Sequence, residues 1–140
     1  MTELNDAALD AIADRAASIA GIASVAIFAV ERGTSALRLA AAAGIEGPAL
    51  ERLTAAVRDP EHPVARALSD ESPTIDVLPT APGGPRLRSH IPLRVGGAED
   101  RDAIGVLAVA HDLPLAEDQR RQLIDVAAAA EAALGRLDEN

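Results

Sequence analysis

Residues 103–110 read Ala-Ile-Gly-Val-Leu-Ala-Val-Ala, a run without one polar side chain. A strand that is apolar at consecutive positions is typical of the centre of a sheet that is covered on both faces. Residues 24–30, Ser-Val-Ala-Ile-Phe-Ala-Val, are likewise apolar at every position after Ser24. The two runs therefore predict two central strands with packed layers above and below them.

Shorter segments predict the strands around this centre. Residues 37–43 follow the first run after a turn at 31–35, a spacing that fits a hairpin. Residues 74–77 alternate between polar and apolar side chains, as a short edge strand does. Residues 89–95 form a further strand, in which Pro92 favours an edge or a bulge.

Helical periodicity flanks these strands. Apolar residues recur at spacings of three and four over residues 4–20 and 117–137. Residues 48–57 and a segment starting at Pro63 predict two short helices, whereas 79–85 is rich in proline and glycine and predicts irregular structure. We therefore expect one α+β domain over residues 1–140, with a central antiparallel sheet of five to six strands and helices on its faces.

Composition excludes several functional classes. The net charge is −9, all 13 basic residues are arginine, and none of them form the dense cluster that nucleic acid or an anionic membrane surface requires. The absence of cysteine removes thiol nucleophiles, zinc–thiolate sites and iron–sulfur clusters. The chain has 32 alanines and a single aromatic residue, Phe28, so its core must be built from small and aliphatic side chains.

Targeting signals are also lacking in the printed sequence. The first six residues include two acidic side chains and no basic one, unlike the basic start of a signal peptide. The apolar run 16–30 is shorter than the ~20 residues of a membrane span. We expect a cytoplasmic protein that does not associate with membranes. The high alanine and arginine content suggests a GC-rich bacterial genome.

Residues for catalysis or metal binding are few. The three histidines, His62, His90 and His111, are not spaced as metal ligands, so no metal site is predicted. Ser89 and His90 are neighbours on a predicted strand, and successive side chains point to opposite faces, which argues against a Ser–His dyad. No nucleophile elbow or phosphate-binding loop is present. We expect a protein that is not an enzyme.

Taken in order, several segments resemble a GAF domain over nearly the whole chain. The most specific pair is Pro92-Leu93-Arg94-Val95 followed by Ile104-Gly105-Val106-Leu107. The resemblance implies a GAF/PAS-like sheet with the terminal helices on one face and the short helices and a loop on the other. The matching segments are 23–28, 37–44, 62–68, 74–77, 89–95, 103–109 and 116–118.

The resemblance also implies a sensory domain with a small-molecule pocket between the sheet and residues 60–90, relaying through the terminal helices to a signalling partner. The ligand and any cofactor are not identified, because the cysteines of bilin-binding and methionine-sulfoxide-reducing members are absent, as is the lysine of the cyclic-nucleotide signature. The final helix departs from the family by starting at Ala116 instead of a capping serine or threonine. The expected lining residues are Phe28, Val64, Leu68, Ile75, Leu87, Arg88, Ser89, His90 and Ile91.

Two alternatives stay open at this point. The aliphatic residues of the expected lining could simply fill the core, leaving no pocket. The chain could also be a homodimerisation or protein-interaction module that needs no ligand, because the terminal helices carry apolar stripes on which two copies could meet. The expected dimer contacts are Leu9, Ile12, Leu123, Val126, Ala130 and Leu134.

Overall fold

The fold was analysed in a computed structural model, which describes residues 2–19, 21–31, 36–45, 47–69, 74–77, 87–94 and 103–139. The described elements follow the predicted order of helix, two strands, short helices, three strands and helix. They are α1 (Thr2–Ala17), β1 (Ile22–Val30), β2 (Leu37–Ala43), α2 (Gly47–Ala56), α3 (Pro63–Arg66), the 3₁₀ helix η1 (Ala67–Ser69), β3 (Thr74–Val77), β4 (Leu87–Arg94), β5 (Ala103–His111) and α4 (Glu117–Glu139). The predicted irregular segment 79–85 lies outside the described residues.

The strands form one antiparallel sheet in the order β2-β1-β5-β4-β3. The two predominantly apolar runs form most of β1 and β5, which pair with each other near the middle of the sheet, as the sequence predicts. Four of the strands are long, and β3 is a four-residue strand at one edge. The predicted α+β architecture, an antiparallel sheet with helices packed on it, is confirmed.

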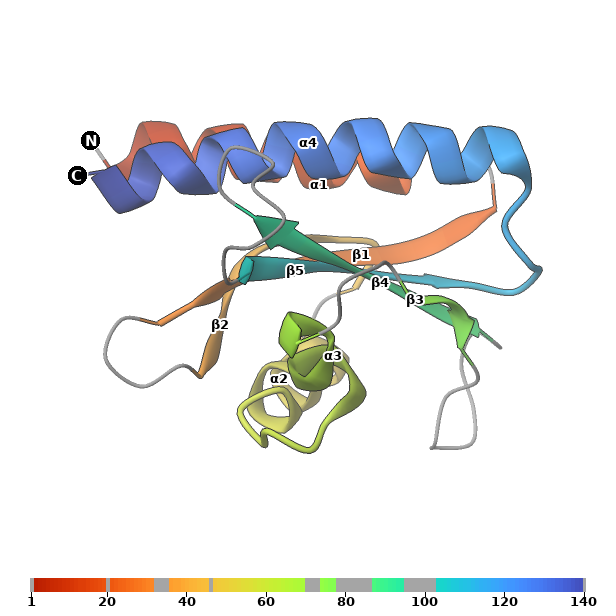
Figure 1. Ribbon diagram of the computed structural model, residues 1–140, viewed down its shortest axis with the longest axis horizontal. Coiled ribbons are helices and arrows are strands. Elements are labelled where there is room, and N and C mark those ends of the chain that lie inside the picture. Colours follow the sequence, from red (N-terminus) through yellow and green to blue (C-terminus); the bar gives the residue numbers. More distant parts are fainter. Residues whose placement is uncertain are drawn as a thin grey trace.

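Each face of the sheet has its own core, and helices cover both faces (Figure 1). Helices α1 and α4 run antiparallel to each other over one face, α1 against β1 and β2, and α4 against β4 and β5. Helices α2 and α3 lie with η1 on the opposite face. We call these the terminal-helix face and the short-helix face. Burial on both faces explains why β1 and β5 are apolar at every position except Ser24 and His111, the last residue of β5.

Pro92 lies where the ladder tolerates it. Its cross-strand partner on β5 is Val106, while the described pairing of β4 with β3 involves only His90 and Arg88. Pro92 therefore lies beyond the described contact between β4 and β3, a position consistent with the edge location that proline favours.

The start of α4 replaces its missing cap in another way. Ala116 has no side-chain acceptor, but its backbone N–H donates to Oε1 of Gln119 at 2.7 Å. This contact is the returning half of a capping box, in which a residue in the first turn reaches back to the cap position. The expected loss at Ala116 is therefore partly offset. Among the described residues, no helix combines the length and the apolarity needed to cross a bilayer.

Candidate functional site

The short-helix face of the sheet has a floor of small side chains. Two neighbouring rows of the antiparallel register cross it: Ala26, Ala108 and His90 in the first row, and Ser24, Ala110 and Arg88 in the second. Ala26, Ala108 and Ala110 are all buried, and we call them the alanine floor. Because a methyl group is the largest side chain in the floor, other atoms must lie directly over the backbone of the sheet here.

Two basic side chains border the alanine floor along β4. His90 is buried and lies in the row of Ala108, and Arg88 is half-buried and lies in the row of Ala110. Desolvation by burial lowers the pKa of the Arg88 guanidinium from its ordinary value. Arginine nevertheless stays protonated in proteins, so this edge of the floor carries a partly desolvated cation and a neighbouring imidazole.

Apolar residues of the next register row, Phe28 and Val106, close the end of the floor beside Ala26 and Ala108. Phe28 is fully buried and packs in one cluster with Val64, Ala67 and Val106. Leu68, in η1, packs against the same cluster. Phe28 lies two residues after Ala26 on the same face of β1. The only Phe, Tyr or Trp side chain of the chain is therefore at the border of the alanine floor.

Helix α3 is fixed over this face by His62. Its side chain is the N-cap, and Nδ1 accepts the N–H of Val64 at 3.1 Å. Desolvation by burial lowers the pKa of the His62 imidazole below 6.5, and the nearby Asp59 carboxylate opposes this with a smaller effect. The neutral ring, which can accept a hydrogen bond, is thus the form that the fold favours.

Stability should depend on the pH through His62. Between the lowered pKa of folded His62 and the unfolded value of 6.5, the unfolded chain binds more protons than the folded one. The contribution of His62 to stability is therefore complete above pH 6.5 and is lost as the pH falls through this window. The measurement is the urea midpoint as a function of pH. His62→Asn keeps a capping side chain but does not titrate, and it should show a shallower pH dependence. Identical slopes for the two proteins would contradict this assignment.

The predicted lining residues divide between the two faces. Phe28, Val64, Leu68, Arg88 and His90 belong to the short-helix face. Ile75 lies on β3, which pairs with β4 at the edge of the sheet.

Leu87, Ser89 and Ile91 must be removed from that lining. Ile91 packs in the core under α1 and α4, and Leu87 and Ser89 share its side of β4 because side chains alternate along a strand. The expectation that consecutive residues of this strand all line one pocket is therefore wrong.

Ser89 instead meets a histidine that sequence reasoning did not link to it. Its Oγ lies 2.8 Å from Nε2 of His111, and both residues are fully buried. The predicted separation of Ser89 from His90 follows from strand alternation, as β4 forms as expected. The contact with His111 depends on the register of β4 and β5, in which Leu87 pairs with His111. No local signal in the sequence gives this register.

The expected dimer contacts are also corrected by burial. Five of the six residues, Leu9, Leu123, Val126, Ala130 and Leu134, are at most 4% exposed in the core of the terminal-helix face, and Ile12 packs against that core. The stripes that predicted a dimer seam are the stripes by which α1 and α4 cover their own sheet. The outward side of α4 instead carries Ile124, which is 56% exposed.

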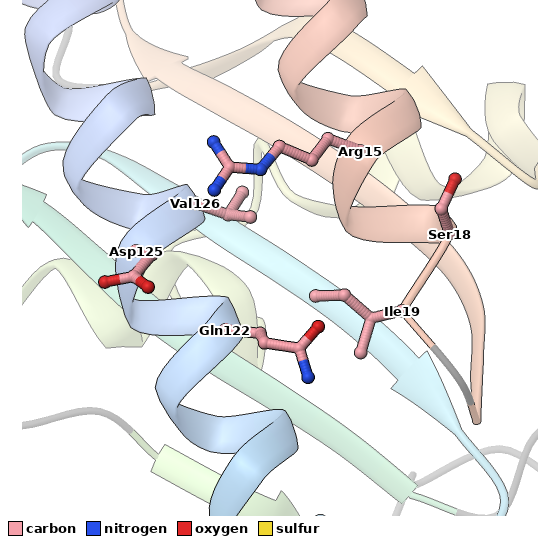
Figure 2. A pocket seen from close by; sticks show the side chains of 6 residues that line it. All are labelled: Arg15, Ser18, Ile19, Gln122, Asp125 and Val126. Carbon is pink, nitrogen blue, oxygen red and sulfur yellow. The ribbon is translucent and has the colours of Figure 1, made fainter.

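A small open pocket lies in the groove between these two helices (Figure 2). Its volume is about 170 Å³, and its lining comes in equal parts from α4 and from the end of α1 with the residues that follow it: Arg15, Ser18, Ile19, Gln122, Asp125 and Val126. The pocket belongs to the helix layer and is separated from the alanine floor by the sheet. Among the described residues, no three His, Cys, Asp or Glu side chains converge as they would around a metal ion.

Comparison with known proteins bears on the fold. A family model described as GAF domain matches residues 5–136. The GAF domain region of a putative membrane protein from Geobacter sulfurreducens superposes with a TM-score of 0.74 at 16% identity, covering 96% of this chain and 95% of that one. The GAF-B domain of DevS from Mycobacterium smegmatis gives 0.71 at 18% identity, with 96% of both chains covered.

A third similar structure is an enzyme, the type II free methionine-R-sulfoxide reductase from Thermoplasma acidophilum. It gives a TM-score of 0.73 at 14% identity and covers 96% of this chain and 94% of that one. At such identities the structural matches establish the fold and leave the chemistry open. None of the curated proteins compared matches this sequence.

Proposed function

Because the chain belongs to the GAF domain family, we propose that it is a sensory domain whose small-molecule ligand binds over the alanine floor. The ligand would lie between the sheet and the short-helix side, against Phe28, Val64 and Leu68. The output would be a displacement of α1 and α4, which a signalling partner reads. This proposal concerns binding, and we expect no catalytic step.

The observation that carries the proposal is the composition of the short-helix face. A binding site needs an apolar surface with a few polar groups placed along it. The alanine floor with Phe28 supplies the apolar surface, and Arg88 and His90 supply the polar groups along one edge. A partly desolvated guanidinium forms its strongest hydrogen bonds with carboxylate or phosphate oxygens. The ligand class is therefore a small, largely apolar molecule with an anionic group.

Native mass spectrometry of the purified protein tests this proposal. A retained ligand gives a fixed excess over the 14.4 kDa of the chain or over twice that mass. The chain contains no tryptophan or tyrosine, so near-ultraviolet absorbance of the purified protein would reveal an aromatic ligand directly. No excess mass, together with no thermal stabilisation by a panel of small carboxylates and phosphates, would refute the proposal.

Arg88→Gln should weaken ligand retention by about tenfold to a hundredfold, because a hydrogen bond to a charged group contributes about 1.5–3 kcal/mol. The measurement is the ligand-bound fraction in the native spectrum across a dilution series. Arg52→Gln is the matched control, since Arg52 is exposed on α2 and should leave retention unchanged. Equal retention by Arg88→Gln and the wild type would remove Arg88 from the site.

The second candidate is a homodimer that needs no ligand. It is favoured by the outward side of α4, where Ile124 is exposed and the exposed Ala128 and Ala132 follow at helical spacing. The same mass spectrum separates the candidates. A dimer mass without excess would support the interaction module, and a mass excess that persists in the monomer would support the sensor.

A further inference from the structure

We propose that Ser89 and His111 are positioning residues that couple the ligand face of β4 to the start of α4. The inference rests on the proposed function, because it takes the site beside Arg88 and His90 as the input. It assigns a role to the buried Ser89–His111 pair, which the binding site itself does not use.

The hydrogen bonds of the pair have a fixed direction. Nδ1 of His111 lies 2.8 Å from the carbonyl oxygen of Leu113, and Nε2 lies 2.8 Å from Oγ of Ser89. A carbonyl oxygen only accepts, so Nδ1 carries the hydrogen and donates it to Leu113. In the neutral ring Nε2 is then an acceptor, and the Ser89 hydroxyl donates to it. One continuous chain of hydrogen bonds thus runs from β4 through the His111 ring to the backbone of residue 113.

The input end of this chain lies within the proposed site. Ser89 stands between Arg88 and His90, and strand alternation directs its side chain to the terminal-helix face while theirs face the ligand. A shift of the β4 backbone that follows contact at Arg88 or His90 therefore moves the Ser89 hydroxyl with it. The shift thus passes from the ligand face to the terminal-helix face between adjacent residues of β4, and no longer pathway is needed.

The output end is the connector 112–116, between β5 and α4. The Leu113 side chain is 72% exposed, so it has little packing, and the carbonyl contact with His111 fixes the backbone at this point. Two residues further on, Leu115 is buried in the core under α1 and α4. Ala116 is then held by Gln119 in the first turn of α4. The hydrogen bond to Leu113 therefore determines where α4 begins.

Burial argues against a catalytic role for the same pair. Ser89 and His111 are both 0% exposed, and the orienting group for the ring is a backbone carbonyl. A nucleophile must reach its substrate, which a fully enclosed hydroxyl does not. An enclosed, directional contact between two elements suits positioning instead, because any loss of alignment leaves a buried acceptor without its donor.

Hydrogen–deuterium exchange tests the coupling with a substitution in place of the unidentified ligand. His90→Ala perturbs the ligand face of β4. In the wild-type background it should speed exchange of the amides of residues 113–121 about tenfold. Weakening the hydrogen bond between His111 and Leu113 makes local opening of this segment more frequent. In a Ser89→Ala background the same substitution should change these amides less than about twofold.

Two further variants make this result specific. His111→Asn retains an N–H donor for Leu113 but removes the acceptor for Ser89, and it should abolish the coupling as Ser89→Ala does. Ser18→Ala is the matched control, since the Ser18 hydroxyl hydrogen-bonds within its own helical turn, to the carbonyl of Asp14. It should leave the response of residues 113–121 to His90→Ala intact.

The proposal would be overturned if His90→Ala leaves residues 113–121 unchanged, or if its effect persists in both the Ser89→Ala and His111→Asn backgrounds. If the variants fail to fold, the tautomer of the His111 ring in the wild-type protein tests the proposed chain of hydrogen bonds instead. Nitrogen-15 NMR must show the hydrogen of neutral His111 on Nδ1, and a hydrogen on Nε2 would refute the chain. The absence of a retained ligand together with no thermal stabilisation by small carboxylates or phosphates refutes the proposed function alone, because none of the exchange or NMR measurements uses a ligand.

Discussion

Phe28→Ala should lower the free energy of unfolding by about 3–5 kcal/mol, the usual cost of emptying a fully buried aromatic site. Phe28 is 0% exposed, and the buried residues around it in the short-helix cluster are alanines, valines and a leucine. Small neighbours on a sheet are poorly able to close over the space that a ring leaves. With total stabilities of about 5–15 kcal/mol for such domains, this change removes a large share.

The measurement is urea denaturation followed by far-ultraviolet circular dichroism, because the chain has no tryptophan or tyrosine to report by fluorescence. Phe28→Leu is the matched control, since it retains most of the apolar volume and should cost less than about 1.5 kcal/mol. A loss below about 1 kcal/mol for Phe28→Ala would mean that the short-helix face is loosely packed and that the ring does not support it.

Gly105→Ala should cost about 3 kcal/mol or more, although alanine is better than glycine in an unhindered strand. A Cβ at this position would lie 2.3 Å from the carbonyl oxygen of Phe28 and 2.9 Å from Cδ1 of Leu134. The oxygen belongs to the backbone of β1, the neighbouring strand, so it cannot move away without opening the β1–β5 ladder. Glycine is required because α4 and β1 both approach β5 closely at this point.

Gly47→Ala separates collision from backbone strain in the same urea experiment. Gly47 has a φ of 63°, but a Cβ added there would meet nothing within 4 Å, so its substitution should cost only about 1–2 kcal/mol. The double variant Gly105→Ala/Leu134→Ala relieves the side-chain contact but leaves the backbone collision. It should therefore be no more stable than Gly105→Ala. Wild-type stability of Gly105→Ala would show that the two strands separate here without cost.

The order and type of the elements could be predicted because they depend on local pattern. The runs at 24–30 and 103–110 are apolar at every position but Ser24, and this property places them at the centre of a sheet. The periodicity of 4–20 and 117–137 predicted two amphipathic helices in the same way, and both form with ends shifted by a few residues. The resemblance to GAF domains added the assignment of helices to faces, and the helices lie on those faces in the structure.

The composition of the candidate site was only half predictable. The resemblance to GAF domains implied Phe28, Val64, Leu68, Arg88 and His90 as lining residues, and the structure has them on one face of the sheet. Leu87, Ser89 and Ile91 were added as neighbours in sequence, although alternation sends them to the other face. Alternation alone excludes a lining that contains both Ser89 and His90, and the packing of Ile91 under α1 and α4 decides which set of residues faces the short helices.

By itself, the sequence determined that this chain forms an antiparallel α+β sheet with two covered faces, because hydrophobic periodicity is a property of each segment alone. Tertiary structure decided which partner each apolar stripe takes: the stripes of α1 and α4 meet their own sheet, where the same periodicity would equally suit a second copy. It also decided that Ser89 meets His111, 22 residues away. Such pairings depend on the register between strands, and register emerges only when all the strands and helices pack together.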